Sequence, residues 1–114
     1  MYTRAWGASY KVRKMLEKDI ERKLVAGVHR LGGAAYKWTA PGQSGVPDRI
    51  VFLPGGRIVF VELKTENGKL TMNQILQQKR LKDLGCQVVT LYGLEQVEYF
   101  LEQAREVIDE VRTT

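Results

Sequence analysis

The chain has 114 residues, of which 44% are hydrophobic and 27% charged, so we expect one folded domain over residues 1–114 rather than a disordered chain. No apolar run approaches the roughly 20 residues of a membrane span, and the N-terminus lacks the apolar segment of a secretory signal. One cysteine, Cys86, allows no internal disulfide, and together with the one histidine, His29, it cannot supply the usual zinc ligand sets. These features predict a cytoplasmic protein without a membrane partner, in which any metal has oxygen ligands.

The charge balance is basic, with a formal net charge of +5. Such a balance suits a polyanionic partner such as a nucleic acid, although a basic protein without one would look the same. The basic residues crowd the first thirty positions: Arg4, Lys11, Arg13, Lys14, Lys18, Arg22, Lys23 and Arg30.

The first predicted element is a helix over residues 8–31, with apolar residues at three- and four-residue steps. Gly32 and Gly33 end it. A short strand over 34–38 follows, and residues 39–46, rich in glycine, proline and serine, form a loop.

Two strand-like runs, 49–53 and 57–61, flank a Pro54-Gly55 turn and predict a hairpin. Both runs are apolar on both faces, so we expect a sheet that is covered on both sides.

A helix capped by Thr71 and reaching Leu84, a buried strand over 87–92 and a helix over 94–111 complete the chain. The order is α-β-β-β-α-β-α. Because a helix connects the third and fourth strands, we expect them to be parallel in a mixed α/β sheet flanked by helices.

Three polar residues stand at the strand ends of the hairpin. Asp48 opens the first strand, whereas Glu62 and Lys64 follow the second and, two residues apart, point to the same side. In a hairpin the start of one strand lies beside the end of the other, so we expect these side chains to converge.

Two carboxylates and a lysine suit the hydrolysis of a phosphodiester. Asp48, Glu62 and the backbone carbonyl of Leu63 can hold Mg²⁺ or Mn²⁺, and Lys64 can orient the attacking water. The alternative is structural, with Asp48 capping a turn and Glu62 pairing with Lys64 at a solvated edge. The spacing Glu-x-Lys alone is weak evidence, because Glu21-Arg22-Lys23 also has it.

The residues around these positions resemble the VRR-NUC family of the PD-(D/E)XK nuclease superfamily, above all its compact stand-alone phage and bacterial members. The resemblance runs from Glu17 to Leu91 and rests on residues 45–49, on residues 56–64, and on Leu70, Thr71, Gln74, Leu81, Leu84 and Gly85. It implies a restriction-endonuclease-like core, Mg²⁺ or Mn²⁺ as cofactor, DNA as substrate and a homodimer, in a bacterial host cell if a phage encodes the chain.

Residue by residue, the resemblance assigns the catalytic triplet to Asp48, Glu62 and Lys64. It places Gln74 near the metal-bound water or the scissile phosphate. Family members also direct a glutamate of the first helix at the metal, and Glu17 or Glu21 matches it, with Glu17 fitting the spacing slightly better.

The DNA contacts that we expect surround this site. Ser44 and the backbone at Gly45 belong to the loop that leads into Asp48, and Arg49 follows it, placed for a phosphate or for a salt bridge. Lys37 is placed to touch a phosphate, whereas its aromatic neighbours are more typical of a core or its rim.

We therefore predict a homodimeric, metal-dependent DNA endonuclease that selects branched DNA, such as a Holliday junction, by its shape. The final helix, with Tyr99 and Phe100, is the expected dimer surface. The alternatives are an inactive DNA-binding module on this fold, a nuclease for RNA or for specific duplex sequences, and a structural basic protein.

Overall fold

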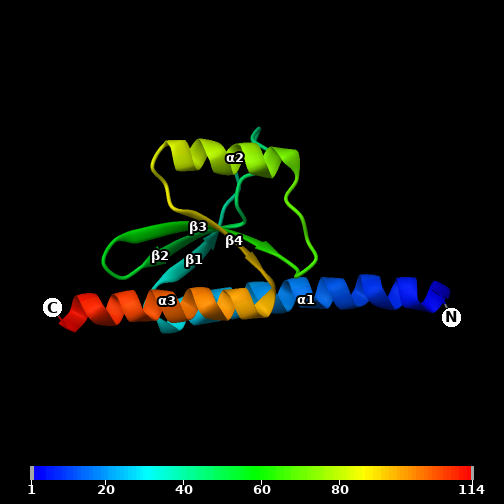
Figure 1. Ribbon diagram of the computed structural model, residues 1–114, viewed down its shortest axis with the longest axis horizontal. Coiled ribbons are helices and arrows are strands. Elements are labelled where there is room, and N and C mark those ends of the chain that lie inside the picture. Colours follow the sequence, from blue (N-terminus) through cyan, green and yellow to red (C-terminus); the bar gives the residue numbers. More distant parts are fainter. Residues whose placement is uncertain (1, 114) are drawn as a thin grey trace.

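A computed structural model describes residues 2–113 of the chain, with side chains from residue 11 onward except residue 13. Three helices and four strands follow one another in the predicted order (Figure 1). Their bounds are α1 Tyr2–Arg30, β1 Ala34–Lys37, β2 Arg49–Leu53, β3 Arg57–Lys64, α2 Met72–Asp83, β4 Val88–Tyr92 and α3 Gly93–Thr113.

The four strands form one mixed sheet in the order β1-β2-β3-β4. The first three strands are antiparallel neighbours, and β4 is parallel to β3, as the helical connection predicted. In the β2–β3 hairpin Gly55 follows Pro54 with a φ of +89°, the backbone conformation that favours glycine at the second central position of such a turn. The α/β fold class is thus confirmed.

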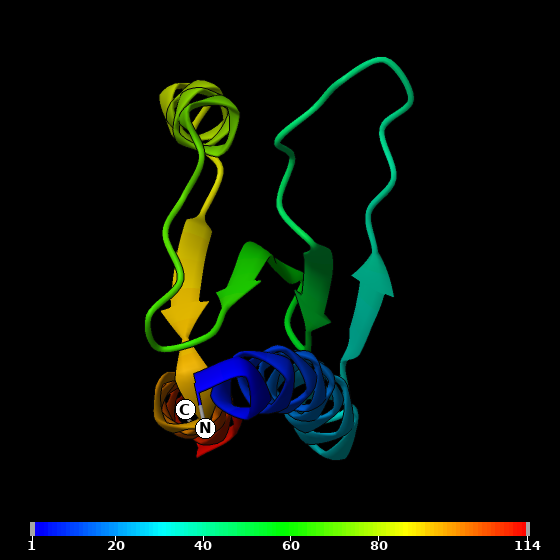
Figure 2. The same ribbon diagram turned by 90° about the vertical axis from the view of Figure 1, so that its right-hand side faces the viewer.

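The long helices α1 and α3 pack together against one face of the sheet, which we call the inner face (Figures 1 and 2). Alternate residues of β2 and β3 point to it and are buried, because side chains alternate along a strand. They join the apolar stripe of α1 in one core, which includes Ile20, Leu24, Val28, Val51, Leu53, Val59 and Val61.

The opposite, outer face is only partly covered, so the prediction of a sheet covered on both sides is wrong. Helix α2 and the loop over residues 38–48 rise from this face (Figure 2) and leave Phe52 37% and Ile58 46% exposed. The strands are apolar on both faces, but both long helices pack on the inner one.

Helices α1 and α3 and strand β3 are longer than predicted, whereas α2 matches its predicted bounds closely. Helix α1 begins at Tyr2 and projects beyond the sheet (Figure 1), so its apolar stripe is buried from Ile20 onward, whereas Val12 and Leu16 are exposed. Strand β3 continues to Lys64 and carries the Glu62-Leu63-Lys64 segment within the sheet. Over residues 2–113 we find no helix with the length and apolar character of a membrane span.

Candidate active site

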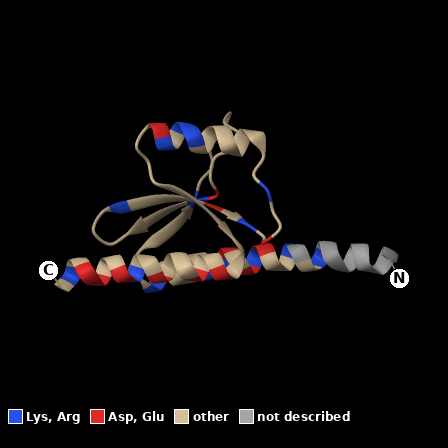
Figure 3. Ribbon diagram, in the orientation of Figure 1, with Lys and Arg blue, Asp and Glu red and all other residues tan. Residues whose placement is uncertain are grey.

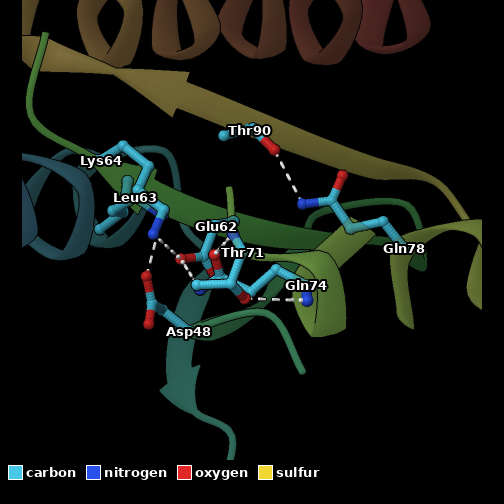
Figure 4. Close-up of polar contacts among 8 residues, drawn as sticks. All are labelled: Asp48, Glu62, Leu63, Lys64, Thr71, Gln74, Gln78 and Thr90. Atoms are coloured by element: carbon cyan, nitrogen blue, oxygen red, sulfur yellow. Dashed lines mark hydrogen bonds and ion pairs between the residues drawn. The ribbon is translucent and has the colours of Figure 1, made fainter. Parts of the chain in front are cut away.

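Asp48 lies beside the end of β3, where the hairpin geometry predicted it. The register pairs Arg49 with Val61, which brings the residue before β2 next to the last residues of β3. Oδ2 of Asp48 accepts a hydrogen bond of 2.9 Å from the backbone N–H of Leu63 (Figure 4). This contact fixes the Asp48 carboxylate next to the Glu62-Leu63-Lys64 segment.

Glu62 is a buried carboxylate with one committed oxygen and one free of partners. Its residue is 2% exposed, and Oε2 lies 3.7 Å from Nζ of Lys64. Oε1 is buried and has no hydrogen-bond partner. Burial, followed by the negative charge of Asp48, raises the pKa of Glu62 to about 7, although Lys64 acts in the opposite direction. A buried carboxylate with a free oxygen calls for a proton or a cation.

Gln74 connects this carboxylate to the start of α2. Its Nε2 donates a hydrogen bond of 3.0 Å to Oε2 of Glu62 (Figure 4). Its Oε1 accepts one of 2.9 Å from the backbone N–H of Thr71, and the Thr71 hydroxyl accepts from the Gln74 N–H, which makes a capping box. The predicted Thr71 cap is confirmed. The cap also orients the Gln74 amide, because the end that accepts from Thr71 must be its oxygen.

The loop before Asp48 packs on the first turn of α2. Gly45 has a φ of +83°, and a Cβ there would lie 2.6 Å from the Asn73 carbonyl carbon. The Asn73 side chain donates a hydrogen bond of 3.0 Å to the Ser44 hydroxyl. The close approach that we predicted between Gly45 and a substrate is, in this structure, made to α2.

A cleft of about 590 Å³ contains the site. Among the residues lining it are four basic side chains, Lys37, Arg49, Lys64 and Lys69, and four acidic ones, Glu17, Glu21, Asp48 and Glu62. The structure thus brings together the triplet, Gln74, both candidate glutamates of α1, Lys37 and Arg49, but Ser44 and Gly45 do not line the cleft. Around it, basic residues mark the connector to α2 and the second half of α2, which ends on an acidic residue, whereas both signs occur along the described part of α1 and along α3 (Figure 3).

The two glutamates of α1 have different partners. Glu21 forms an ion pair with Arg49, whose side chain is only 14% exposed and also donates to the Ala35 carbonyl. Glu17 is half-exposed and lies 3.5 Å from Lys14. The Arg49–Glu21 pair also borders a larger, mostly apolar hollow of about 960 Å³ between α1 and β1.

No group of three or more His, Cys, Asp and Glu side chains in the described part of the chain is close enough to hold a metal. The residues that fit a hard cation are Asp48, Glu62 with its unpartnered Oε1, and the backbone carbonyl of Leu63. A site of this kind would leave several positions to water, as Mg²⁺ commonly does.

Sequence reasoning missed two features of this region. Lys69 lines the cleft, although we predicted no site residue between Lys64 and Gln74. Thr90 of β4 lies beside Glu62 in the parallel register. Its signal in the sequence was one polar residue in the otherwise apolar run Val88-Val89-Thr90-Leu91.

Comparison with known proteins agrees with this fold. The VRR-NUC domain matches residues 6–95 of the chain. A phage protein, "Putative nuclease p44" of Acyrthosiphon pisum secondary endosymbiont phage 1, is 48% identical over 80 residues, which are 70% of this chain and 86% of that protein. A solved structure described as "VRR_NUC domain" superposes with a TM-score of 0.72 at 33% identity, over 75% of this chain and 94% of the other.

Proposed function

The chain belongs to the VRR-NUC family and is a nuclease, and from this premise we propose that it is a metal-dependent DNA endonuclease selective for branched DNA. The observation that carries the proposal is the environment of the Glu62 carboxylate. Its buried carboxylate keeps Oε1 free of protein partners while Asp48 and Lys64 stand beside it. A carboxylate with a purely structural role would be expected to use both oxygens in hydrogen bonds.

Asp48, Glu62 and the Leu63 carbonyl would hold Mg²⁺ or Mn²⁺. Such a cation, when bound, lowers the pKa of a ligated water and offsets the negative charge of the phosphate under attack. The charges of the cleft support this requirement. Its four acidic side chains balance its four basic ones, so a phosphate beside Asp48 and Glu62 would meet repulsion without a cation.

Lys64 and Gln74 would prepare the attack. The Lys64 ammonium, close to Glu62, can orient the attacking water and stabilise the negative charge that develops on the phosphate oxygens. Gln74 donates a hydrogen bond to Oε2 of Glu62 and so fixes the orientation of the carboxylate. Its other oxygen, Oε1, stays available to a cation. The water would add to phosphorus and release a proton to solvent, the bond from phosphorus to the leaving oxygen would break, and that oxygen would receive a proton from solvent.

Of the two glutamates of α1, the contacts favour Glu17 as the one that serves the site. Glu21 is committed to the largely buried Arg49, and releasing it would leave that guanidinium unpaired. Glu17 has only a half-exposed ion-pair partner, which is worth little in water.

The contacts in the structure separate the residues predicted to touch DNA into those that line the cleft and those with structural partners. Lys37 and Lys69 line the cleft and would meet backbone phosphates. Arg49 fits better as a structural partner of Glu21 and Ala35. Ser44 and Gly45 would act by holding the loop against α2, with the adjoining backbone facing the DNA.

A homodimer would place two such sites at a fixed spacing, as paired cuts across a junction require. Tyr99 on α3 is 68% exposed and is available for that contact, whereas Phe100 packs against the core. A Tyr99→Glu variant should dissociate the dimer in light scattering. If the variant keeps the molar mass of a dimer, the interface lies on another surface. The function would be exercised in the cytoplasm, which is that of the bacterial host cell if a phage encodes the chain.

The test of the function is cleavage of a labelled four-way junction, a matched linear duplex and a matched RNA, by wild type and Lys64→Ala, in Mg²⁺, Mn²⁺ and EDTA. We expect metal-dependent cuts in the junction that the variant loses. Equal cleavage of the duplex would overturn the selectivity, and cleavage of RNA alone would overturn the substrate. Tight junction binding without cuts in either metal would leave a DNA-binding module.

A further inference from the structure

Helix α2 is attached to the sheet by polar contacts rather than by an apolar face. Its large apolar side chains Met72, Ile75 and Leu76 are 68%, 47% and 50% exposed, and its one buried residue is Gln78, at 6%. Leu81 is half-buried but is not among the residues that pack against the core. A helix packed in the ordinary way buries an apolar stripe. Hydrogen bonds therefore contribute much of what holds α2 in place.

Two of these bonds form a matched pair (Figure 4). Gln74 and Gln78 are one turn apart and share a face of α2. Nε2 of Gln74 donates to Glu62, and Nε2 of Gln78 donates to the Thr90 hydroxyl at 2.8 Å. Glu62 and Thr90 are themselves register partners across the parallel strands β3 and β4. Two successive positions of the helix are thus bonded to two neighbouring positions of the sheet.

We propose that the Gln78–Thr90 hydrogen bond positions α2 so that Gln74 reaches Glu62, which makes both Gln78 and Thr90 positioning residues for the site. A helix bonded to the sheet at Gln74 alone could roll about its axis or tilt around that point. The second bond, one turn further on, opposes both motions.

Apart from the Gln74–Glu62 bond, no other side-chain hydrogen bond of α2 within residues 11–113 reaches the sheet. The capping box lies within the helix and its cap, so it cannot tie α2 to the sheet. The loop touches the first turn through Gly45 and Ser44, and Gln77 donates to Gln43, but these contacts lie on the loop side. A buried glutamine is costly where a leucine would fit a sheet-facing position, unless its hydrogen bond is used.

The experiment rests on the proposed function for its kinetic part. Thr90→Val removes the hydroxyl at nearly constant volume, Thr90→Ser keeps it, and Gln78→Leu removes the donor. Gln87→Leu, at an exposed position before β4, is the matched control. We expect kcat on the cleaved DNA to fall about 10-fold in Thr90→Val and Gln78→Leu with KM changed less than about 2-fold, because small displacements at a catalytic group are costly. Thr90→Ser and the control should keep wild-type kcat, and the double variant should be no slower than either single one.

A second readout does not need activity. The side-chain amide of Gln74, held between Thr71 and Glu62, should give a distinct, slowly exchanging NMR signal that shifts in Thr90→Val and persists in Thr90→Ser. An unchanged Gln74 signal and wild-type kcat in Thr90→Val would overturn the proposal, as would equal losses in Thr90→Ser and Thr90→Val. If wild type cleaves nothing, the proposed function fails while the Gln74 signal still decides the positioning role.

Discussion

The two faces of the sheet are held in different ways. On the inner face, α1 and α3 bury an apolar core in which Leu24, Val28, Val51 and Val61 have no exposed surface. On the outer face, α2 touches the sheet through Gln74 and Gln78, while apolar side chains such as Ile58 stay partly in water. Apolar burial is non-directional and supplies stability, whereas hydrogen bonds fix directions. The candidate site uses the directional face.

This comparison predicts that changes on the outer face cost activity and changes on the inner face cost stability. The largest effect is expected at the carboxylates. Glu62→Gln and Asp48→Asn should each lower DNA cleavage by about 10³-fold or more, because each removes a charge that would hold the cation. Single-turnover cleavage measures this loss.

The control for these variants is their fold. Far-ultraviolet circular dichroism and urea unfolding should show that both variants remain folded. If Glu62→Gln cleaves DNA within about 2-fold of the wild-type rate, Glu62 takes no part in the chemistry and the proposed mechanism is wrong.

The inner face is tested by Leu24→Ala, which should lower the free energy of unfolding by about 2–5 kcal/mol because it opens a cavity in the core. Ile58→Ala, at a 46% exposed position of the outer face, should cost less than about 1 kcal/mol. Urea unfolding gives both values. Similar losses of unfolding free energy in the two variants would mean that the outer face is also covered in solution. The proposed difference between the two faces would then be wrong.

The raised pKa of Glu62 predicts an unusual pH dependence of stability. With a folded pKa of about 7 against 4.5 unfolded, the folded state binds more protons than the unfolded state between these values. Stability without metal should therefore fall as pH rises through this window, by at most about 3 kcal/mol, and level off above it.

The check is the free energy of unfolding in EDTA at pH 5, 6, 7 and 8 for wild type and Glu62→Gln. The variant should lack this component and be the more stable protein at pH 8. Curves that run parallel from pH 5 to 8 would show that burial does not penalise the Glu62 charge.

The smallest effect concerns the loop over residues 38–48, which connects β1 to β2 and packs on α2. Gly45→Ala should cost about 1–3 kcal/mol and reduce cleavage, because its Cβ would collide with the Asn73 backbone and displace α2. Gly42→Ala is the matched control, since Gly42 has a similar φ of +79° but open space around it. Equal losses in both variants, by urea unfolding and cleavage rate, would assign the effect to φ alone.

Much of the fold and of the site was predictable from local patterns. The spacing of apolar residues indicated the two long helices, runs of β-branched and aromatic residues indicated the hairpin strands, Pro54-Gly55 indicated their turn, and Thr71 indicated the start of α2. Hairpin geometry then required Asp48 to meet the end of β3, which the bond to the Leu63 N–H confirms. These features depend on residues close in sequence or joined by one tight turn.

Other features depend on contacts between distant segments, and there local patterns were insufficient. Nothing near β2 or β3 indicates that both long helices cover the same face and leave Phe52 and Ile58 exposed. The pairing of Glu62 with Thr90, the approach of Gly45 to α2 and the commitment of Glu21 to Arg49 each join segments at least 28 residues apart. Periodicity and turn chemistry specify which elements form and which side chains share a face, because those properties repeat along the chain. The register of a parallel pair and the partner of a buried charge follow only from how the elements pack, since packing brings those atoms within reach of each other.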